Sequence, residues 1–361
     1  MNASILGVPV PMDLIAFAVA LLASLGLTIP VRHFALRFGM VDKPGPRKVH
    51  LTPMPLLGGI AIYLGFVLAV LLALPGPAQQ QIVGILAGAT LLAIVGVLDD
   101  GGVLHHQVKL FIGMPIAAVF LLTSGVRAGI ITLLVPGPIG VILDNCLTVL
   151  WVVGVTAAFS ILDHMDGLCA GIAAIAAVSF ALTAGVWGQT MVRTLAIATF
   201  GAALGFLRWN FSPAKIFMGD GGAMFLGFLM ATLGLKLHPP VDLLPGTWLV
   251  PVLILGIPIF DTTLVSISRA RRGLIPFTSP GKDHTAHRLA NLGLGHRGAV
   301  LVMYCVAIIL GALGWIAASL SARSEYIILA SAGAFAILAV FFFESIPYDR
   351  QPKLEKSPSA T

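Results

Sequence analysis

Apolar segments follow one another along almost the entire chain, and most are close to the twenty or so residues that a bilayer-spanning helix needs. Only 10% of the 361 residues are charged, whereas soluble globular domains carry about 25%. Such a chain has too few charges to cover a water-exposed surface of its size, so its natural surroundings are lipid. The sequence therefore predicts an all-α polytopic membrane protein.

We expect about eleven transmembrane helices, each near the length that a bilayer requires. The predicted spans are 12–31, 56–74, 82–98, 110–124, 141–160, 169–187, 192–208, 222–237, 247–267, 299–319 and 324–343. The first span has no basic region before it, so it is expected to be a retained helix and not a cleaved signal peptide. Residues 1–344 would then form a single transmembrane domain, and residues 345–361 a short polar cytoplasmic tail.

The basic residues predict the orientation of these helices. Seventeen of the 21 Lys and Arg residues fall in the tail or in the loops that follow odd-numbered spans. Lys and Arg collect on the cytoplasmic side of membrane proteins. These loops are therefore predicted to be cytoplasmic, with the N-terminus outside. The same rule accounts for the net charge of +6, which consequently does not indicate a nucleic-acid partner.

Five carboxylates lie at or just inside the cytoplasmic ends of predicted spans: Asp99, Asp100, Asp163, Asp166 and Asp261. A carboxylate in such a place is costly unless it is paired, hydrated or bound to a metal, so it marks a functional site. Carboxylates suit Mg²⁺, and the neighbouring Arg and Lys side chains suit phosphates. The pattern predicts chemistry on a magnesium–diphosphate at the cytoplasmic face. A transporter, the alternative, would more often place ionisable groups near mid-membrane.

Six motifs occur in order on the predicted cytoplasmic side. They are D-K-P-G-P-R-K-V-H with P-L-L-G-G from Asp42, V-G-V-L-D-D ending at Asp100, F-S-I-L-D-H-M-D-G-L around Asp163, N-F-S-P-A-K-I-F-M-G-D from Asn210, G-I-P-I-F-D ending at Asp261, and D-H-T-A-H-R-L from Asp283. Together they resemble the polyprenyl-phosphate N-acetylhexosamine-1-phosphate transferases, glycosyltransferase family 4. The details are more similar to the undecaprenyl-phosphate GlcNAc-1-phosphate transferase branch than to the phospho-MurNAc-pentapeptide translocase branch.

The resemblance implies an activity and its partners. The expected reaction moves an N-acetylhexosamine-1-phosphate, with GlcNAc-1-phosphate as the first choice, from a UDP-sugar to undecaprenyl or another polyprenyl phosphate. UMP is released, and an envelope glycan is initiated. The resemblance also implies Mg²⁺ as cofactor, with Mn²⁺ as the alternative ion, a bacterial inner (plasma) membrane location, and a homodimer as one assembly state.

The catalytic residues expected from this pattern are Asp99, Asp100, Asp163 and Asp166. Asp99 and Asp100 are adjacent and cannot face the same way, so one is expected to meet the lipid phosphate while the other orients Lys109 or a metal-bound water. A phosphate monoester, with a second pKa of about 6, is already largely dianionic at neutral pH. Positioning and electrostatics are therefore favoured over proton abstraction alone, and a covalent aspartyl intermediate stays open.

The resemblance assigns roles to residues outside this group. Asp220 matches the metal ligand, Ser160 is a weaker ligand, and Asp42 and Asp261 support the site. The residues expected to bind substrates are Arg47, Lys48, Lys109, Asn210, His284, His287 and Arg288.

Several positions depart from the family pattern. Ala157 and Ser160 stand where the family usually has asparagines, Gly221 stands where it has serine, and Thr285 and Ala286 interrupt its histidine loop. Two hypotheses follow. The chain is a working enzyme with an altered donor or metal shell, or it is a catalytically impaired member that binds UDP-sugar or lipid phosphate without turnover. The carboxylates are retained, which favours the working enzyme.

Overall fold

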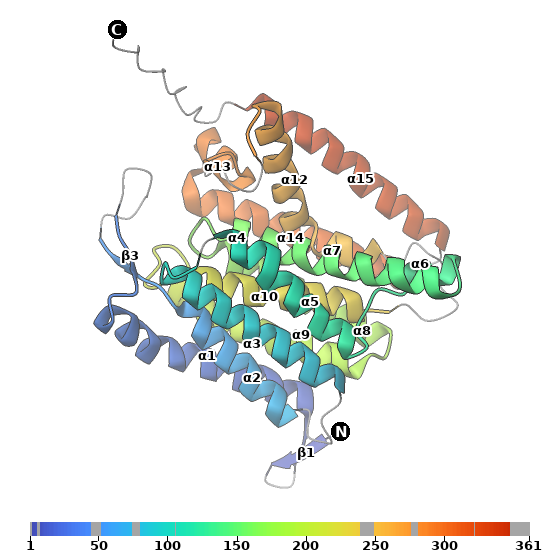
Figure 1. Cartoon of the computed structure of the whole chain (residues 1–361), viewed down its shortest axis with the longest axis horizontal. Helices are drawn as coiled ribbons and strands as arrows, with labels where there is room; N and C mark the ends of the chain where they lie inside the picture. Colours follow the sequence, from blue (N-terminus) through green and yellow to red (C-terminus); the bar gives the residue numbers. More distant parts are fainter. Residues whose placement is uncertain are drawn as a thin grey trace.

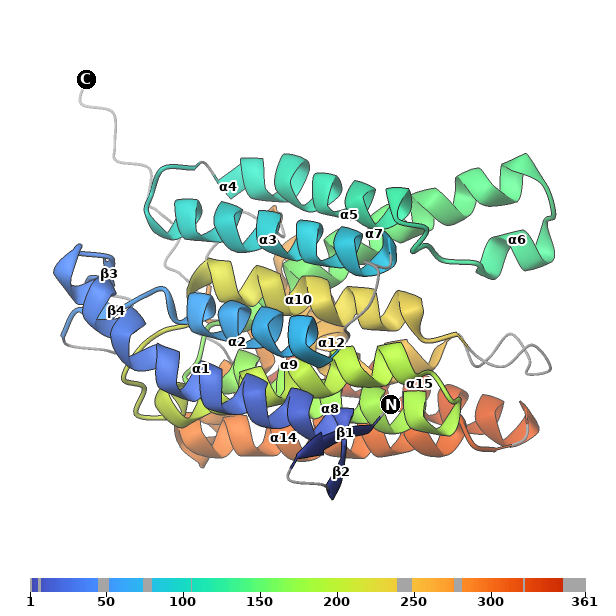
Figure 2. The ribbon, with the colours of Figure 1, turned by 90° about the horizontal axis from the view of Figure 1, so that it is seen from below.

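The computed structural model of the chain is built from α-helices, as predicted. It describes residues 2–5, 8–44, 52–73, 80–104, 106–238, 249–275, 281–320 and 322–346. The long helices run roughly side by side (Figure 2). Strand β3 (Val41–Asp42) and helix α4 (His106–Val108) lie near one end of this array, and helix α6 (Ile130–Leu134) lies near the other.

Each predicted span corresponds to helical structure. The helices are α1 (Met12–Arg37), α2 (Gly58–Ala73), α3 (Gln80–Asp100), η1 and α5 (Lys109–Gly113 and Met114–Thr123), α7 (Pro138–Leu162), α8 (Leu168–Val186), α9 (Thr190–Asn210), α10 (Gly219–Lys236), α11 and α12 (Val250–Ile254 and Gly256–Arg271), α14 (Gly295–Ala317) and α15 (Ala322–Ser345). In the described residues, seven helical stretches are long and apolar enough to cross a membrane. The chain is therefore a multi-pass membrane protein, while the count of eleven spans stays a prediction. The polar tail falls almost wholly outside the described residues.

Short elements that the apolar pattern did not predict lie between the long helices. Two strand pairs occur, β1 (Asn2–Ile5) with β2 (Val8–Pro11), and β3 with β4 (Met54–Pro55). Helix α13 (Thr285–Leu289) precedes η3 (Ala290–Leu294), in which the chain kinks because Gly293 leaves the helical conformation with φ at 96°, and η1 is π-helical. Single π-helical turns are frequently found at functional sites, and η1 begins at Lys109, one of the predicted site residues.

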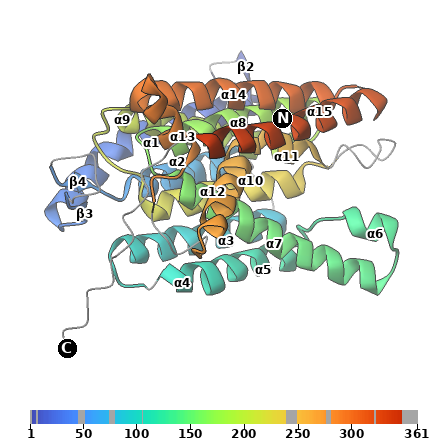
Figure 3. The ribbon, with the colours of Figure 1, turned by 90° about the horizontal axis from the view of Figure 1, so that it is seen from above.

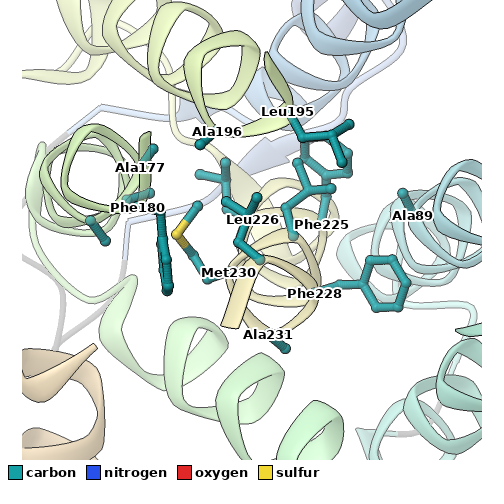
Figure 4. Close-up of a cluster of buried hydrophobic side chains, with 14 of the residues drawn as sticks. Ala89, Ala177, Phe180, Leu195, Ala196, Phe225, Leu226, Phe228, Met230 and Ala231 are labelled. Atoms are coloured by element: carbon teal, nitrogen blue, oxygen red, sulfur yellow. The ribbon is translucent and has the colours of Figure 1, made fainter. Parts of the chain in front are cut away.

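Helix α10 forms the centre of the protein. Every residue from Gly221 to Leu235 is buried. Its sequence is apolar on all sides, which is typical of a helix enclosed by other helices. Figure 4 shows Phe225, Phe228 and Met230 of α10 surrounded by side chains from α3, α8 and α9.

Glycines let three helices meet backbone to backbone close to the predicted site. A Cβ atom on Gly59 of α2 would lie 2.2 Å from the backbone nitrogen of Gly222, and one on Gly96 of α3 would lie 2.3 Å from Cα of Gly221. Such contacts between small residues are a common way to pack helices in membranes. Because Gly96 is near the end of α3 and Gly221 near the start of α10, Asp99 and Asp100 come next to Asp220.

Helix α15 lies at the periphery (Figures 1 and 3), where it contacts α12 and α14. Its apolar side chains are largely exposed, including Phe335, Leu338 and Phe341. In a membrane protein, such a surface suits contact with lipid. One end of α15 nevertheless reaches the polar part of the structure through Glu344, which is described below.

Candidate functional site

Asp100 joins the end of α3 to the start of α10. Its Oδ1 accepts a hydrogen bond from the backbone N–H of Asp220 at 2.9 Å, and its Oδ2 accepts one from the N–H of Gly221 at 3.3 Å. The first N–H groups of a helix have no partner within the helix, and the positive end of its dipole favours a carboxylate. Asp100 therefore fixes the position of Asp220 relative to α3.

Lys109 links two of the predicted site carboxylates. Its Nζ donates to Asp99 Oδ2 at 2.8 Å and to Asp220 Oδ2 at 2.6 Å. The other oxygen of Asp220, Oδ1, accepts a hydrogen bond of 2.7 Å from the Ser160 hydroxyl. Residues from α3, η1, α7 and α10 thus converge on the Asp220 carboxylate, and Asp99 orients Lys109, which is one of the two roles expected for the adjacent pair.

Asp163 and Asp166 lie in the turn between α7 and α8 and have different environments. Asp166 Oδ2 accepts a hydrogen bond from the backbone N–H of Ala214 at 2.9 Å. The carboxylate of Asp163 forms no hydrogen bond with any part of the chain that the structure describes. Burial, with the negative charges of Asp220 and Asp100, raises the pKa of Asp163 to about 8. An unpaired acid in this position gains from a cationic partner.

Asn210 connects the two loops beside this turn. Its Oδ1 accepts from the N–H of Gly167 at 3.0 Å, and its Nδ2 donates to the carbonyl of Ile216 at 3.0 Å. The side chain is buried. The structure therefore shows Asn210 holding the segment that carries Asp166 against the segment that leads to Asp220, and its contact with a substrate stays a prediction.

Histidines gather around Asp261 on the neighbouring part of the site. Asp261 Oδ2 lies 2.9 Å from His284 Nδ1, and its Oδ1 accepts from the N–H of Thr285 at 2.7 Å. The ring of His164 stacks on that of His284 with centroids 4.1 Å apart, and the His287 ring is 5.0 Å from His164. Burial, reinforced by His284, lowers the pKa of His164 to about 3, so this imidazole is neutral.

Asp283 is held by Arg269 of α12 and by Arg272, the residue that follows this helix. Arg269 donates to both of its oxygens at 3.0 Å, and Arg272 donates to Oδ2. Burial opposes ionisation of this carboxyl, but the hydrogen bonds and charge of Arg269, with those of Arg272, outweigh it and hold the pKa of Asp283 below its usual value. The pairs fix the start of the segment that carries His284 and His287.

Arg288 is completely buried and makes its contacts with the protein. Its guanidinium donates to the carbonyl oxygens of Asp283 at 2.9 Å and Phe343 at 2.5 Å, to Glu344 Oε1 at 2.9 Å, and to the Ser268 hydroxyl. The structure thus places Arg288 where it anchors α13 to α12 and α15. Sequence reasoning missed Glu344, although a carboxylate at the end of an apolar span was a signal for it.

The remaining predicted residues lie apart from these contacts or outside the described chain. Asp42 is in β3, paired in register with Met54. Arg47 and Lys48 lie outside the described residues. Among the departures from the family pattern, Ser160 contacts Asp220 directly, the Thr285 backbone contacts Asp261, Ala157 and Ala286 are buried, and Gly221 packs against Gly96.

A cluster of carboxylates with one lysine, at the ends of membrane-type helices, is suited to binding a divalent cation together with phosphates. Such a framework defines a multi-pass membrane enzyme with a site at one end of its helices. Residues 82–238 match the family described as Glycosyl transferase family 4. The chain belongs to this family, and it is a transferase.

Curated relatives match most of the chain. A Bacillus subtilis (strain 168) protein named "Probable undecaprenyl-phosphate N-acetylglucosaminyl 1-phosphate transferase" is 38% identical over 299 residues, covering 82% of each chain. The Decaprenyl-phosphate N-acetylglucosaminephosphotransferase of Mycobacterium tuberculosis (strain ATCC 25618 / H37Rv) is 34% identical over 77% of this chain and 75% of its own. The Undecaprenyl-phosphate alpha-N-acetylglucosaminyl 1-phosphate transferase of Escherichia coli (strain K12) is 28% identical over 79% of this chain and 78% of its own.

Proposed function

We propose that this chain transfers GlcNAc-1-phosphate from UDP-GlcNAc to undecaprenyl phosphate or a related polyprenyl phosphate, releasing UMP. The single observation that carries the proposal is the convergence of Asp99, Lys109 and Ser160 on Asp220 in a chain of this family. An oxygen of the acceptor phosphate attacks the phosphorus that bears the sugar. The bond from that phosphorus to the bridging oxygen breaks, and the bridging oxygen leaves on UMP.

The donor set around Asp220 fits Mg²⁺, with Mn²⁺ as the alternative. Asp220 Oδ1 and the Ser160 hydroxyl are already adjacent, and Asp163 provides a further carboxylate without a hydrogen-bond partner among the described residues. Hard cations prefer such oxygen ligands. When bound, the ion would neutralise charge on the diphosphate as UMP leaves. Asp220, Ser160 and Asp163 would hold it.

The chain's own residues supply positioning and charge. Lys109 is oriented by Asp99 and presents an ammonium group beside Asp220, where it can contact phosphate oxygens. Asp100 fixes the first turn of α10, so we assign it to positioning Asp220. Asp166 and Asn210 hold the loops on either side. All of these contacts are made within the protein itself, as electrostatic preorganisation requires.

The histidine segment is proposed to receive the donor. His284 and His287 lie on α13 or at its start, which Arg288 and the Asp283 pairs anchor. The nitrogens of imidazole rings can form hydrogen bonds with the phosphate and sugar groups of such a donor. Arg47 and Lys48 remain proposed contacts of the acceptor phosphate. Both substrates would approach from the cytoplasmic face of a bacterial inner membrane, with the N-terminus outside. A homodimer is the proposed assembly, and it follows from the resemblance alone.

The test is an exchange assay on purified protein in detergent. Undecaprenyl phosphate, Mg²⁺ and radiolabelled UDP-GlcNAc should yield labelled lipid and UMP, and EDTA should stop the reaction. Asp220→Asn should abolish turnover while leaving the protein folded. Activity of this variant at the wild-type rate would disprove the site assignment. No product with a panel of UDP-sugars, with binding intact, would identify the chain as a binding protein without turnover.

A further inference from the structure

His164, Asp261 and His284 come from three separate segments and meet beside the Asp220 cluster. His164 is in the turn between α7 and α8, Asp261 is in α12, and His284 caps the start of α13. One candidate ligand atom from each residue lies within 4.8 Å of the other two. Asp261 and His284 are buried, with exposed fractions of 1% and 6%. This cluster has a different donor chemistry from the all-oxygen set around Asp220.

His164 carries a buried nitrogen that the protein leaves unused. Its Nδ1 lies 3.2 Å from the carbonyl oxygen of Ile161, which can only accept, so Nδ1 bears the proton. The lone pair is therefore on Nε2, which is buried and has no hydrogen-bond partner among the described residues. Buried polar atoms are rarely left unpaired without a reason. A histidine whose Nδ1–H donates to a backbone carbonyl is in the arrangement that holds metal-binding imidazoles.

The other two residues are also fixed in place. Asp261 is held by the Thr285 N–H at one oxygen and lies 2.9 Å from His284 Nδ1 at the other. His287, one helical turn after His284, places its ring 5.0 Å from that of His164, beside the three residues of the cluster. Two imidazoles and a carboxylate form a common ligand set for zinc.

We propose that His164, Asp261 and His284 bind a divalent transition-metal ion, with Zn²⁺ as the preferred ion, at a site separate from the proposed Mg²⁺ site. Imidazole nitrogens suit Zn²⁺ and its first-row neighbours, whereas Mg²⁺ prefers oxygen. A tetrahedral ion with bonds of about 2.1 Å needs ligand atoms about 3.4 Å apart. The most distant pair in the cluster, at 4.8 Å or less, would therefore close by no more than about 1.4 Å.

Metal binding here would tie three segments of the site into one unit. These segments are the turn that bears Asp163, helix α12 and the histidine segment, and they are far apart in the sequence. With three protein ligands, a fourth position stays open to water, to His287 or to an anionic oxygen. The inference does not depend on the proposed transfer reaction, since it rests on residues outside the Asp220 cluster.

The test is metal binding by the full-length protein, purified without a polyhistidine tag and stripped with EDTA. Co²⁺ should bind at one equivalent and give the visible absorption of a tetrahedral or five-coordinate site, Zn²⁺ should displace it, and millimolar Mg²⁺ should not. His164→Gln should weaken binding at least about tenfold. The matched control is His33→Gln, because His33 makes the same Nδ1 contact with a backbone carbonyl at the exposed end of α1. It should bind like the wild type.

Each outcome decides the proposal. Absence of stoichiometric Co²⁺ binding by the wild-type protein would overturn it, whatever the variants do. Unchanged Co²⁺ affinity in a folded His164→Gln protein would overturn the ligand assignment. If that variant does not fold, the Co²⁺ spectrum of the wild-type protein decides the proposal by itself. UMP exchange measured on the same samples separates the two proposals. Exchange without Co²⁺ binding contradicts the metal site only, and Co²⁺ binding without exchange contradicts the transfer reaction only.

Discussion

Ser160 offers the sharpest test of how the site holds its proposed cation. Its hydroxyl donates a 2.7 Å hydrogen bond to the Asp220 carboxylate. Removing it by Ser160→Ala takes away an oxygen ligand and frees one side of Asp220 to move. The fold should survive, because Ser160 is partly buried and this bond is its role in the structure.

The size of the effect follows from that contact. A hydrogen bond to a charged group contributes about 1.5–3 kcal/mol to the state in which it forms. Loss of a group that orients a metal ligand typically lowers metal affinity about 10- to 100-fold, which corresponds to about 1.4–2.7 kcal/mol. We therefore expect the Mg²⁺ concentration for half-maximal UMP exchange to rise by this factor. A water that replaces the hydroxyl would bring the value toward the lower end.

The assay is a Mg²⁺ titration of UMP exchange at saturating substrates. Ser160→Asn supplies an amide oxygen of the kind that the family pattern has at this position, and it should bring the half-maximal concentration back toward the wild-type value. Ser179→Ala is the matched control, because Ser179 donates only to a carbonyl within its own helix. An unchanged Mg²⁺ dependence in Ser160→Ala would refute the assignment of Asp220 and Ser160 to the cation.

Three further predictions concern stability. Because the pKa of Asp163 is raised to about 8 in the folded state, this carboxyl destabilises the folded state increasingly as the pH rises from 4 to 8. Asp163→Asn should therefore raise the Tm of EDTA-treated protein at pH 8 but not near pH 4. A lower Tm of the variant at pH 8 would contradict this. Gly96→Val drives a side chain into the backbone of α10 and should lower the free energy of unfolding by at least about 1–3 kcal/mol, and with it the Tm. Gly154→Val, with open space around it, should be tolerated. Arg288→Met removes the buried cation from Glu344, which keeps the largely exposed Arg271 as a charged partner, so the loss of stability should be near the lower end of about 3–5 kcal/mol. Thermal unfolding should show partial recovery in the double variant with Glu344→Gln.

The sequence alone was sufficient to predict the helices and most of the residues of the Asp220 cluster. Apolar segments long enough to span a bilayer predict transmembrane helices directly, because few other structures can contain them. Asp99, Lys109 and Asp220 could be expected together because alternating loops bring helix ends to the same side. Their pairing could not be predicted, because it depends on how closely α3 approaches α10 at Gly96. That approach also turns Asp100 toward the helix N-terminus.

Residues that act through distant partners were harder to predict. His164 lies between two motif aspartates, and nothing in its immediate sequence shows that it stacks on a ring more than a hundred positions away. Glu344 lies at the end of the last apolar span, where it resembled the start of a polar tail. The structure shows it bound to Arg288, and only the packing of α15 against α12 brings the two together. The short helix α13 carried no apolar periodicity of its own.

The contact of Gly59 and Gly96 with α10 divides the site into two halves that differ in how well they accommodate substitutions. On the α10 side, backbone touches backbone, so a new side chain cannot be absorbed by repacking and would have to move a whole helix. The carboxylates at these helix ends therefore keep fixed positions relative to one another. The histidine segment is instead assembled from side chains on short elements, each replaceable without shifting a helix. A substitution in the histidine segment, where Thr285 and Ala286 lie, can therefore be accommodated by side-chain repacking, whereas a side chain added at Gly59 or Gly96 cannot.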